Sequence, residues 1–231
     1  MADFVHHLLF GIYPYIALAV LVVGSVIRYD REPYSWRAGS SQMLRRRQLI
    51  VGSVLFHAGV LTIFAGHLVG LLTPIAIWDM LGVPHGAKQL LAMIAGGVAG
   101  VAAIAGASLL IHRRFLDPRV RAASNFSDNM VILLLWAQLA LGLATIPLSL
   151  QHLDGHEMVK FMNWAQGIFT FRSGAADQIA DVALVFKLHL FMGLTILLLF
   201  PFTRLVHMLS APVRYVWRPG YQVVRSRKLA R

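Results

Sequence analysis

Five long apolar segments constrain the fold of this chain more than any other feature of its sequence. Each is close to the ~20 residues that a helix needs to cross a bilayer. Only 13% of the 231 residues are charged, and the mean hydropathy is +0.66. We place the segments at residues 10–27, 49–72, 90–111, 130–150 and 182–209. This pattern is typical of a polytopic membrane protein, so we predict an all-α integral membrane protein with five transmembrane helices in one bundle, forming a single domain over residues 1–231.

The distribution of basic residues predicts the orientation of this bundle. Of the 21 Lys and Arg residues, 17 lie between the first and second segments, between the third and fourth, or after the start of the C-terminal end at Arg204. The opposite side holds Lys88, Lys160, Arg172 and Lys187. By the positive-inside rule the N-terminus lies outside and the C-terminus in the cytoplasm. We therefore expect a multi-pass protein of the cytoplasmic (inner) membrane, whose net charge of +11 faces lipid headgroups or a partner rather than nucleic acid.

Three further features of the sequence bear on topology and chemistry. The segment 152–180 is too polar to cross a bilayer, and its aromatic residues beside charges favour an interfacial helix on the membrane surface. The chain has no cysteine, which excludes a covalently attached c-type haem, an iron–sulfur cluster held by this chain, thiolate catalysis and a disulfide. The N-terminus, MADFVHH, has no basic stretch of a signal peptide, so we expect the first segment to stay in the mature protein.

Four histidines lie inside or at the ends of two apolar segments, where ionisable residues are costly and often functional. His57 and His67 lie in the second segment, and His189 and His207 in the fifth. Because the two segments run in opposite directions, His67 and His189 share the outer level, and His57 and His207 share the cytoplasmic level. Two levels with one imidazole from each helix suit two haem b groups with bis-histidine ligation.

The spacing of these histidines sets a condition on the fifth segment. Ten residues of helix rise ~15 Å, whereas eighteen rise ~27 Å, so the two pairs match in depth only if the fifth helix tilts or bends. Pro201 supplies a site for a kink. If the helix continues, eighteen residues at ~100° each keep His189 and His207 on one face. The glycines of the second segment leave two readings open, close helix packing or room for a porphyrin: Gly52, Gly59, Gly66 and Gly70.

The chain also resembles a known family, the gamma subunit of membrane-bound respiratory nitrate reductase, which is a dihaem cytochrome b. The resemblance covers nearly the whole chain and is carried by six motifs: GIYPYIA, RYDREPYSWRAGSSQML, LFHAGVLTIFAGHLVGLLTP, RRFLDPRVRA, TIPLSLQHLDGHEM and LLLFPFTRLVHMLSAPVRY. It implies an outer haem on His67 and His189 and an inner haem on His57 and His207, with no catalytic residue in this chain. It also implies docking of a molybdenum-containing catalytic subunit and an iron–sulfur subunit on the cytoplasmic side.

The same resemblance implies a quinol site beside the outer haem. The family's quinol-site lysine corresponds to Lys88, in the outer loop GVPHGAKQLL, and Gly70 and His67 lie on the facing helix. An ordinary reading of Lys88 is an interfacial lysine that extends to water. Quinol oxidation near the outer face would then send electrons through two b haems to the partner subunits and finally to nitrate.

Three rival functions remain to be weighed. A histidine-lined metal or proton transporter would need paired carboxylates in the membrane, and the five segments contain none. A structural anchor without redox activity would not need four depth-matched histidines. A cytochrome b anchor of another quinone-linked oxidoreductase shares the histidines, and the family motifs disfavour it.

Arg113 and Arg114 are either partners of haem propionates or ordinary positive-inside anchors.

Overall fold

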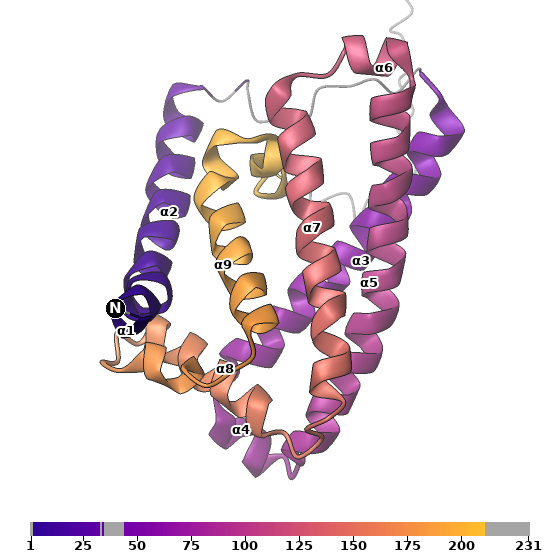
Figure 1. Cartoon of the computed structure of the whole chain (residues 1–231). Coiled ribbons are helices and arrows are strands. Elements are labelled where there is room, and N and C mark those ends of the chain that lie inside the picture. The colour runs from indigo at the N-terminus through magenta and orange to yellow at the C-terminus, as the bar shows by residue number, and fades with distance from the viewer. Residues whose placement is uncertain (1, 33, 35–43, 211–231) are drawn as a thin grey trace, which may run out of the picture.

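The computed structural model describes residues 2–32, 34 and 44–210, and these residues form helices and loops without a β-strand. Five helical segments are long and apolar enough to cross a membrane (Figure 1), which confirms the predicted all-α fold. The helices are α1 (Ala2–His7), the π-helix η1 (Leu8–Ile12), α2 (Tyr13–Arg31), α3 (Arg46–Leu72), α4 (Ile75–Met80), α5 (His85–Leu116), α6 (Pro118–Ala122), α7 (Phe126–Ser149), α8 (His156–Phe169) and α9 (Leu184–Leu199). Residues 33, 35–43 and 211–231, which include the basic C-terminal tail, lie outside the described residues.

The long helices pack in an order that differs from their order in the chain. Neighbouring pairs are α2 with α9, α9 with α7, α7 with α5, and α5 with α3. The α3–α5 contact is the most extensive, because small residues let the two backbones approach. A Cβ on Gly52 would lie 3.2 Å from the Gly106 carbonyl oxygen, and a Cβ on Gly59 would overlap the backbone of Ala99. These two glycines therefore serve helix packing.

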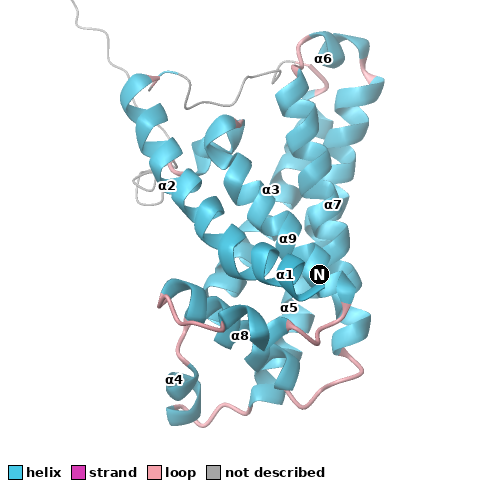
Figure 2. Cartoon of the chain, turned by 60° about the vertical axis from the view of Figure 1, so that its left-hand side comes forward, coloured by secondary structure: helices cyan, strands magenta, loops and turns pink. Residues whose placement is uncertain are grey.

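The polar segment after α7 lies across one end of the bundle, as Figures 1 and 2 show. It contains α8 and the 3-10 helix η3 (Ala175–Ile179). Trp164 donates a hydrogen bond from Nε1 to the Phe10 carbonyl at 2.9 Å, and Gln166 donates to the carbonyls of Leu71 and Thr73 at 3.0 Å each. Helix α8 thus links the N-terminal part of the first span to the C-terminal end of α3. It buries Trp164, Ala165 and Ile168 in the larger apolar core, and Met162 on the same helix is fully buried.

The fifth span is not one continuous helix. Helix α9 ends at Leu199, and the chain continues through two 3-10 helices, η4 (Phe200–Phe202) and η5 (Arg204–Met208). Proline has no N–H and crowds the carbonyl four residues earlier, so Pro201 ends the α-helix instead of only bending it. Between the two short helices Thr203 is extended, with φ −121° and ψ 177°. His189 and His207 therefore do not lie on one continuous helix, and the prediction that they share a helix face is wrong.

Candidate functional site

The structure brings the four predicted histidines together as two pairs. The ring centres of His67 and His189 are 6.2 Å apart, and those of His57 and His207 are 6.3 Å apart. His57 and His67 extend from α3, His189 from α9, and His207 from η5. The break after Leu199 allows the depths to match: His189 and Leu199 have the same ten-residue spacing as His57 and His67, and the chain then turns before it reaches His207.

The ring separations fit one metal ion between the two imidazoles of each pair. A metal-to-histidine nitrogen bond is about 2 Å long, so two imidazoles on opposite sides of a metal place their ring centres about 6 Å apart. Within the described residues, no group of three or more His, Cys, Asp or Glu side chains is arranged to hold a metal. Each histidine pair thus offers two ligands, which suits an iron whose other ligands come from a porphyrin.

Three of the four rings have a hydrogen bond that selects the nitrogen left for ligation. The Nδ1 of His57 lies 2.8 Å from the Ser53 carbonyl oxygen, and that of His67 lies 2.8 Å from the Ile63 carbonyl oxygen. The Nδ1 of His207 lies 2.6 Å from the carbonyl oxygen of Arg204. A carbonyl oxygen only accepts, so Nδ1 carries the proton and the unprotonated Nε2 is available to a metal. A hydrogen bond from the other ring nitrogen is how proteins usually orient a metal-binding histidine.

His189 is fixed by contacts of another kind. Its buried Nδ1 has no hydrogen-bond partner within the described part of the chain. Its ring packs against α7, where a Cβ on Gly142 would lie 3.0 Å from the ring Cε1. One turn earlier on α7, Gln138 donates from Nε2 to the His189 backbone carbonyl at 3.1 Å. Helix α7 therefore sets the position of this ring by steric contact and by a bond to its backbone.

The glycines beside the outer pair have open space around them. A Cβ on Gly66 or on Gly70 would meet no atom within 4 Å, in contrast to Gly52 and Gly59. These two glycines flank His67 on α3. The backbone of α3 at these two glycines is therefore not covered by a neighbouring helix, whereas Gly52 and Gly59 pack on α5.

Lys88 and Gly70, both predicted for the quinol site, are in direct contact. Lys88 lies in the first turn of α5 and not in a loop, and it is 6% exposed. Its ammonium group donates to the Gly70 carbonyl at 3.0 Å and to the Met162 sulfur at 2.8 Å, and lies 4.5 Å from the centre of the Trp78 ring. This burial does not fit a lysine that extends to water. Gly70 lies three residues after His67 on α3, which is about one helical turn.

The two arginines considered as propionate partners are engaged with protein groups. Arg113 is buried and donates to the Leu44 carbonyl at 2.7 Å. Arg114 lies 3.5 Å from a carboxylate oxygen of Asp128. Near them, Asp117 begins α6 by accepting hydrogen bonds from the backbone N–H groups of Val120 and Arg119. These bonds hold the pKa of the Asp117 carboxyl below its usual value.

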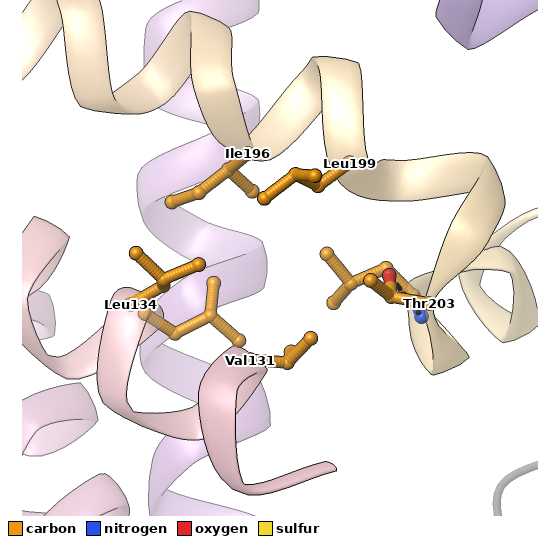
Figure 3. Close-up of a pocket in the computed structure, with 7 residues that line it drawn as sticks. Val131, Leu134, Ile196, Leu199 and Thr203 are labelled. Carbon is orange, nitrogen blue, oxygen red and sulfur yellow. Dashed lines mark hydrogen bonds between the residues drawn. The ribbon is translucent and has the colours of Figure 1, made fainter. Parts of the chain in front are cut away.

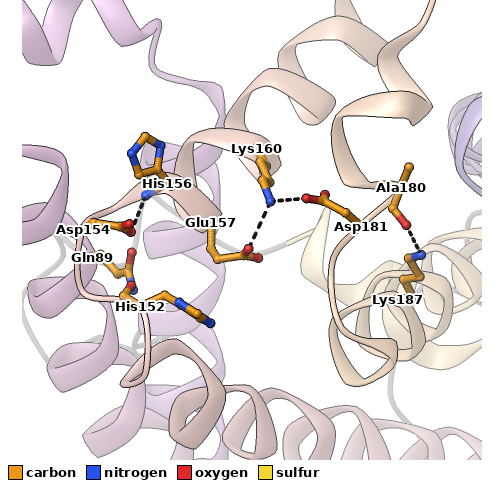
Figure 4. Close-up of polar contacts among 9 residues, drawn as sticks. All are labelled: Gln89, His152, Asp154, His156, Glu157, Lys160, Ala180, Asp181 and Lys187. Carbon is orange, nitrogen blue, oxygen red and sulfur yellow. Dashed lines mark hydrogen bonds and ion pairs between the residues drawn. The ribbon is translucent and has the colours of Figure 1, made fainter.

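A charged cluster lies between α8 and the start of α9, at the end of the bundle that α8 covers (Figure 4). Lys160 pairs with Asp181 at 2.6 Å and with Glu157 at 3.2 Å. The hydrogen bond to Asp181 raises the pKa of Lys160, and the same bond lowers the pKa of Asp181. Lys187 donates to the Ala180 carbonyl at 2.6 Å. These contacts fix the loop that leads into α9 and so to His189.

Several residues around the predicted groups were not identified from the sequence. Trp78 and Met162 enclose Lys88, but they belong to α4 and α8, and no spacing rule connects them to α5. Gln138 had a signal, because it is a polar amide in an apolar span. Arg28 also belongs to this group, since it contacts the chain between α9 and His207.

The sequence profile and the similar proteins all indicate the same family. A sequence profile described as nitrate reductase gamma subunit matches residues 6–227. The chain is 50% identical to the respiratory nitrate reductase 1 gamma chain of Escherichia coli K12, covering 97% of this chain and 99% of that protein. It is 49% identical to the respiratory nitrate reductase 2 gamma chain of the same strain, over 99% and 100% of the two chains. The nitrate reductase gamma chain of Bacillus subtilis is 36% identical, over 95% and 98%.

Proposed function

Because the chain belongs to the nitrate reductase gamma subunit family, we propose that it oxidises quinol near the outer face of the membrane and delivers the electrons to cytoplasmic partner subunits. It is a subunit of a nitrate-reducing oxidoreductase, which disfavours an anchor for another quinone-linked enzyme. The partners would be an iron–sulfur subunit and a molybdenum catalytic subunit, and the location the cytoplasmic (inner) membrane. Two b haems, the outer on His67 and His189 and the inner on His57 and His207, would supply one-electron carriers between the two faces.

The observation that carries this proposal is the pair of ring separations, 6.2 and 6.3 Å, at two levels of the bundle. Three of the four rings also have Nδ1 bound to a backbone carbonyl, which leaves Nε2 for iron. An anchor without redox function would have no need for these separations. A transporter would need acidic groups along the spans, which are absent from the apolar segments.

Lys88, Gly70 and His67 support a quinol site at the outer level. Oxidation of quinol to quinone releases two electrons and two protons, and the site lies near the outer surface, where the protons would leave. The Lys88 ammonium group now donates to the Gly70 carbonyl. It would donate instead to a quinol oxygen when quinol enters, while the Trp78 ring holds the cation in place. Lys88 would thereby orient the ring of the substrate.

The direct test is the haem content of the purified assembled complex. We expect a b-type reduced-minus-oxidised spectrum and two haems per gamma chain by a pyridine haemochrome assay. One haem per chain would remove one of the two pairs from the proposal, and none would overturn it. Nitrate reduction driven by quinol should also be lost in His189→Ala, while nitrate reduction driven by a reduced soluble dye should remain. Loss of both activities would show instead that the variant fails to assemble.

A further inference from the structure

The backbone break between α9 and His207 leaves carbonyl groups without their helical partners. Pro201 cannot donate a backbone hydrogen bond, and Thr203 is in an extended conformation. Close to the apolar part of a membrane, an unpaired carbonyl is costly because no water is available to bind it. The break therefore needs a hydrogen-bond donor from another part of the molecule.

Arg28, near the end of α2, supplies that donor. Its Nη1 lies 2.7 Å from the Pro201 carbonyl oxygen and 2.7 Å from the Thr203 carbonyl oxygen. One guanidinium nitrogen thus joins the two ends of the turn between η4 and η5. Arginine stays charged at every relevant pH, and its planar group holds a fixed direction for its donors. A lysine could replace the charge but not this geometry.

The helix turn before Arg28 brings α2 against the same break. Gly24 lies four residues earlier, so it shares a face of α2 with Arg28. A Cβ on Gly24 would lie 2.8 Å from Cγ of Pro201 and 3.0 Å from its Cβ. The missing side chain therefore allows α2 to approach the proline closely enough for Arg28 to reach both carbonyls.

The other side of the break packs on α7. Figure 3 shows apolar side chains of α7, Val131 and Leu134, facing Ile196, Leu199 and Thr203 across a small apolar pocket. After the turn, Leu205 and Val206 are buried in the same cluster as Val131. Arg204 lies 3.4 Å from Asp128 of α7. The segment between α9 and His207 is thus held by α2 through hydrogen bonds and by α7 through packing.

We infer that Arg28 is a positioning residue for the inner haem ligand: by joining the Pro201 and Thr203 carbonyls it sets the turn that directs His207 toward His57. His207 lies in the short helix η5, which begins directly after Thr203, and its Nδ1 bonds to the carbonyl of Arg204, the first residue of that helix. A change in the turn therefore moves the ring and its orienting bond together. This inference rests on the proposed function, because it assumes an inner haem on His57 and His207.

The test compares Arg28→Gln and Arg28→Lys with Arg31→Gln in the assembled complex. Arg31 ends the same helix and is exposed, so its variant removes the same charge. The readouts are the low-spin ferric EPR signals of the two haems and the rate of haem loss to excess apomyoglobin in detergent. The inner signal is assigned as the one missing in His207→Ala. We expect Arg28→Gln to shift the inner signal and to weaken retention of the inner haem by about 10- to 100-fold, Arg28→Lys to have a smaller effect, and Arg31→Gln to have none.

A second variant perturbs the same turn while Arg28 stays unchanged. Gly24→Ala pushes against Pro201, and we expect it to shift the inner signal as well. Gly11→Ala is its control in the same span, because a Cβ there meets Ala176 at 3.6 Å, an ordinary contact. If Arg28→Gln does not accumulate, Arg28→Lys and Gly24→Ala carry the test.

The outcomes separate this inference from the proposed function. A change in the inner signal with an unchanged outer signal supports the positioning role. An unchanged inner signal in the Arg28 variants, or an equal effect on both haems, overturns that role while two haems in the wild-type chain leave the proposed function intact. A wild-type chain without an inner haem overturns both.

Discussion

The outer and inner histidine pairs have almost the same ring separation, 6.2 and 6.3 Å, but the chain reaches that separation in different ways. The outer pair joins two regular α-helices, and α7 positions the His189 ring by contact at Gly142. The inner pair joins α3 to a 3-10 helix that follows a break. Its position depends on hydrogen bonds and ion pairs that connect η5 and the turn before it to α2 and α7. Steric changes on α7 should therefore affect the outer site, and loss of polar contacts near the break should affect the inner site.

The largest effect that distinguishes the two levels should come from Lys88→Ala. A hydrogen bond from a charged donor contributes roughly 1.5–3 kcal/mol, so quinol or inhibitor binding should weaken by about one to two orders of magnitude, with both haems retained. Steady-state kinetics with quinol and a reduced soluble dye measure this, and only the quinol reaction should change. Arg172→Ala is the control, because it removes an exposed cation from the polar segment at the same end of the bundle. Equal quinol kinetics in both variants would move the site away from Lys88.

A membrane potential should slow turnover with quinol but not turnover with a reduced soluble dye. Electrons that enter at the outer level and leave at the cytoplasmic face move toward the negative side, which opposes the transfer. Moving one charge across the full membrane against ~100 mV costs about 2.3 kcal/mol, so turnover with quinol should slow by at most about 50-fold. A dye that reduces the cytoplasmic subunits directly should show no such dependence. Proteoliposomes with an imposed potential measure this, and equal sensitivity of the two donors would contradict the proposed orientation.

The next effect should be confined to the outer pair. In Gly142→Ala the new Cβ would lie 3.0 Å from Cε1 of His189, so the ring or α7 must shift. Overpacking of this kind costs about 1–3 kcal/mol, and we expect the lower end because the ring can tilt. The EPR signal of the outer haem should change and that of the inner haem should not. Gly97→Ala is the control, because its Cβ would meet only the end of Ile146 at 3.4 Å. A change in the inner signal alone would reverse the assignment of the two levels.

The smallest effect should be confined to the inner pair. Asp128 lies 3.4 Å from Arg204 and 3.5 Å from Arg114, and these side chains are mostly buried. An exposed ion pair contributes about 0.2–1 kcal/mol. Because these side chains are partly buried, we expect Asp128→Asn to cost the upper end of that range, to lower the melting temperature and to broaden the inner EPR signal. Asp177→Asn, which removes an exposed carboxylate at the outer end, should leave both signals unchanged. A larger change in the outer signal would show that the break is not held by this contact.

The comparison of the two levels also shows what the sequence could predict. The five spans and the polar segment 152–180, which does not cross the membrane, follow from hydropathy. The depth of His67 and His189 follows from the regular rise of a helix. Both need only local sequence information. The break at Pro201 was foreseen only as a kink, because the sequence does not show whether a proline bends a helix or ends it. The contacts that α2 makes with the broken segment, through Gly24 and Arg28, join residues that are distant in sequence. The burial of Lys88 could not be predicted either, since Met162 reaches it from α8 across the bundle.

The pairing of the four histidines is the central claim, and the haem content of four single variants tests it most directly. His57→Ala, His67→Ala, His189→Ala and His207→Ala would each be purified in the assembled complex and examined by low-temperature absorption and EPR. We predict that His67→Ala and His189→Ala lose the same haem signal, and that His57→Ala and His207→Ala lose the other while the first remains. Loss of one signal by both α3 variants, or loss of both signals by every variant, would contradict pairing by depth across the two spans.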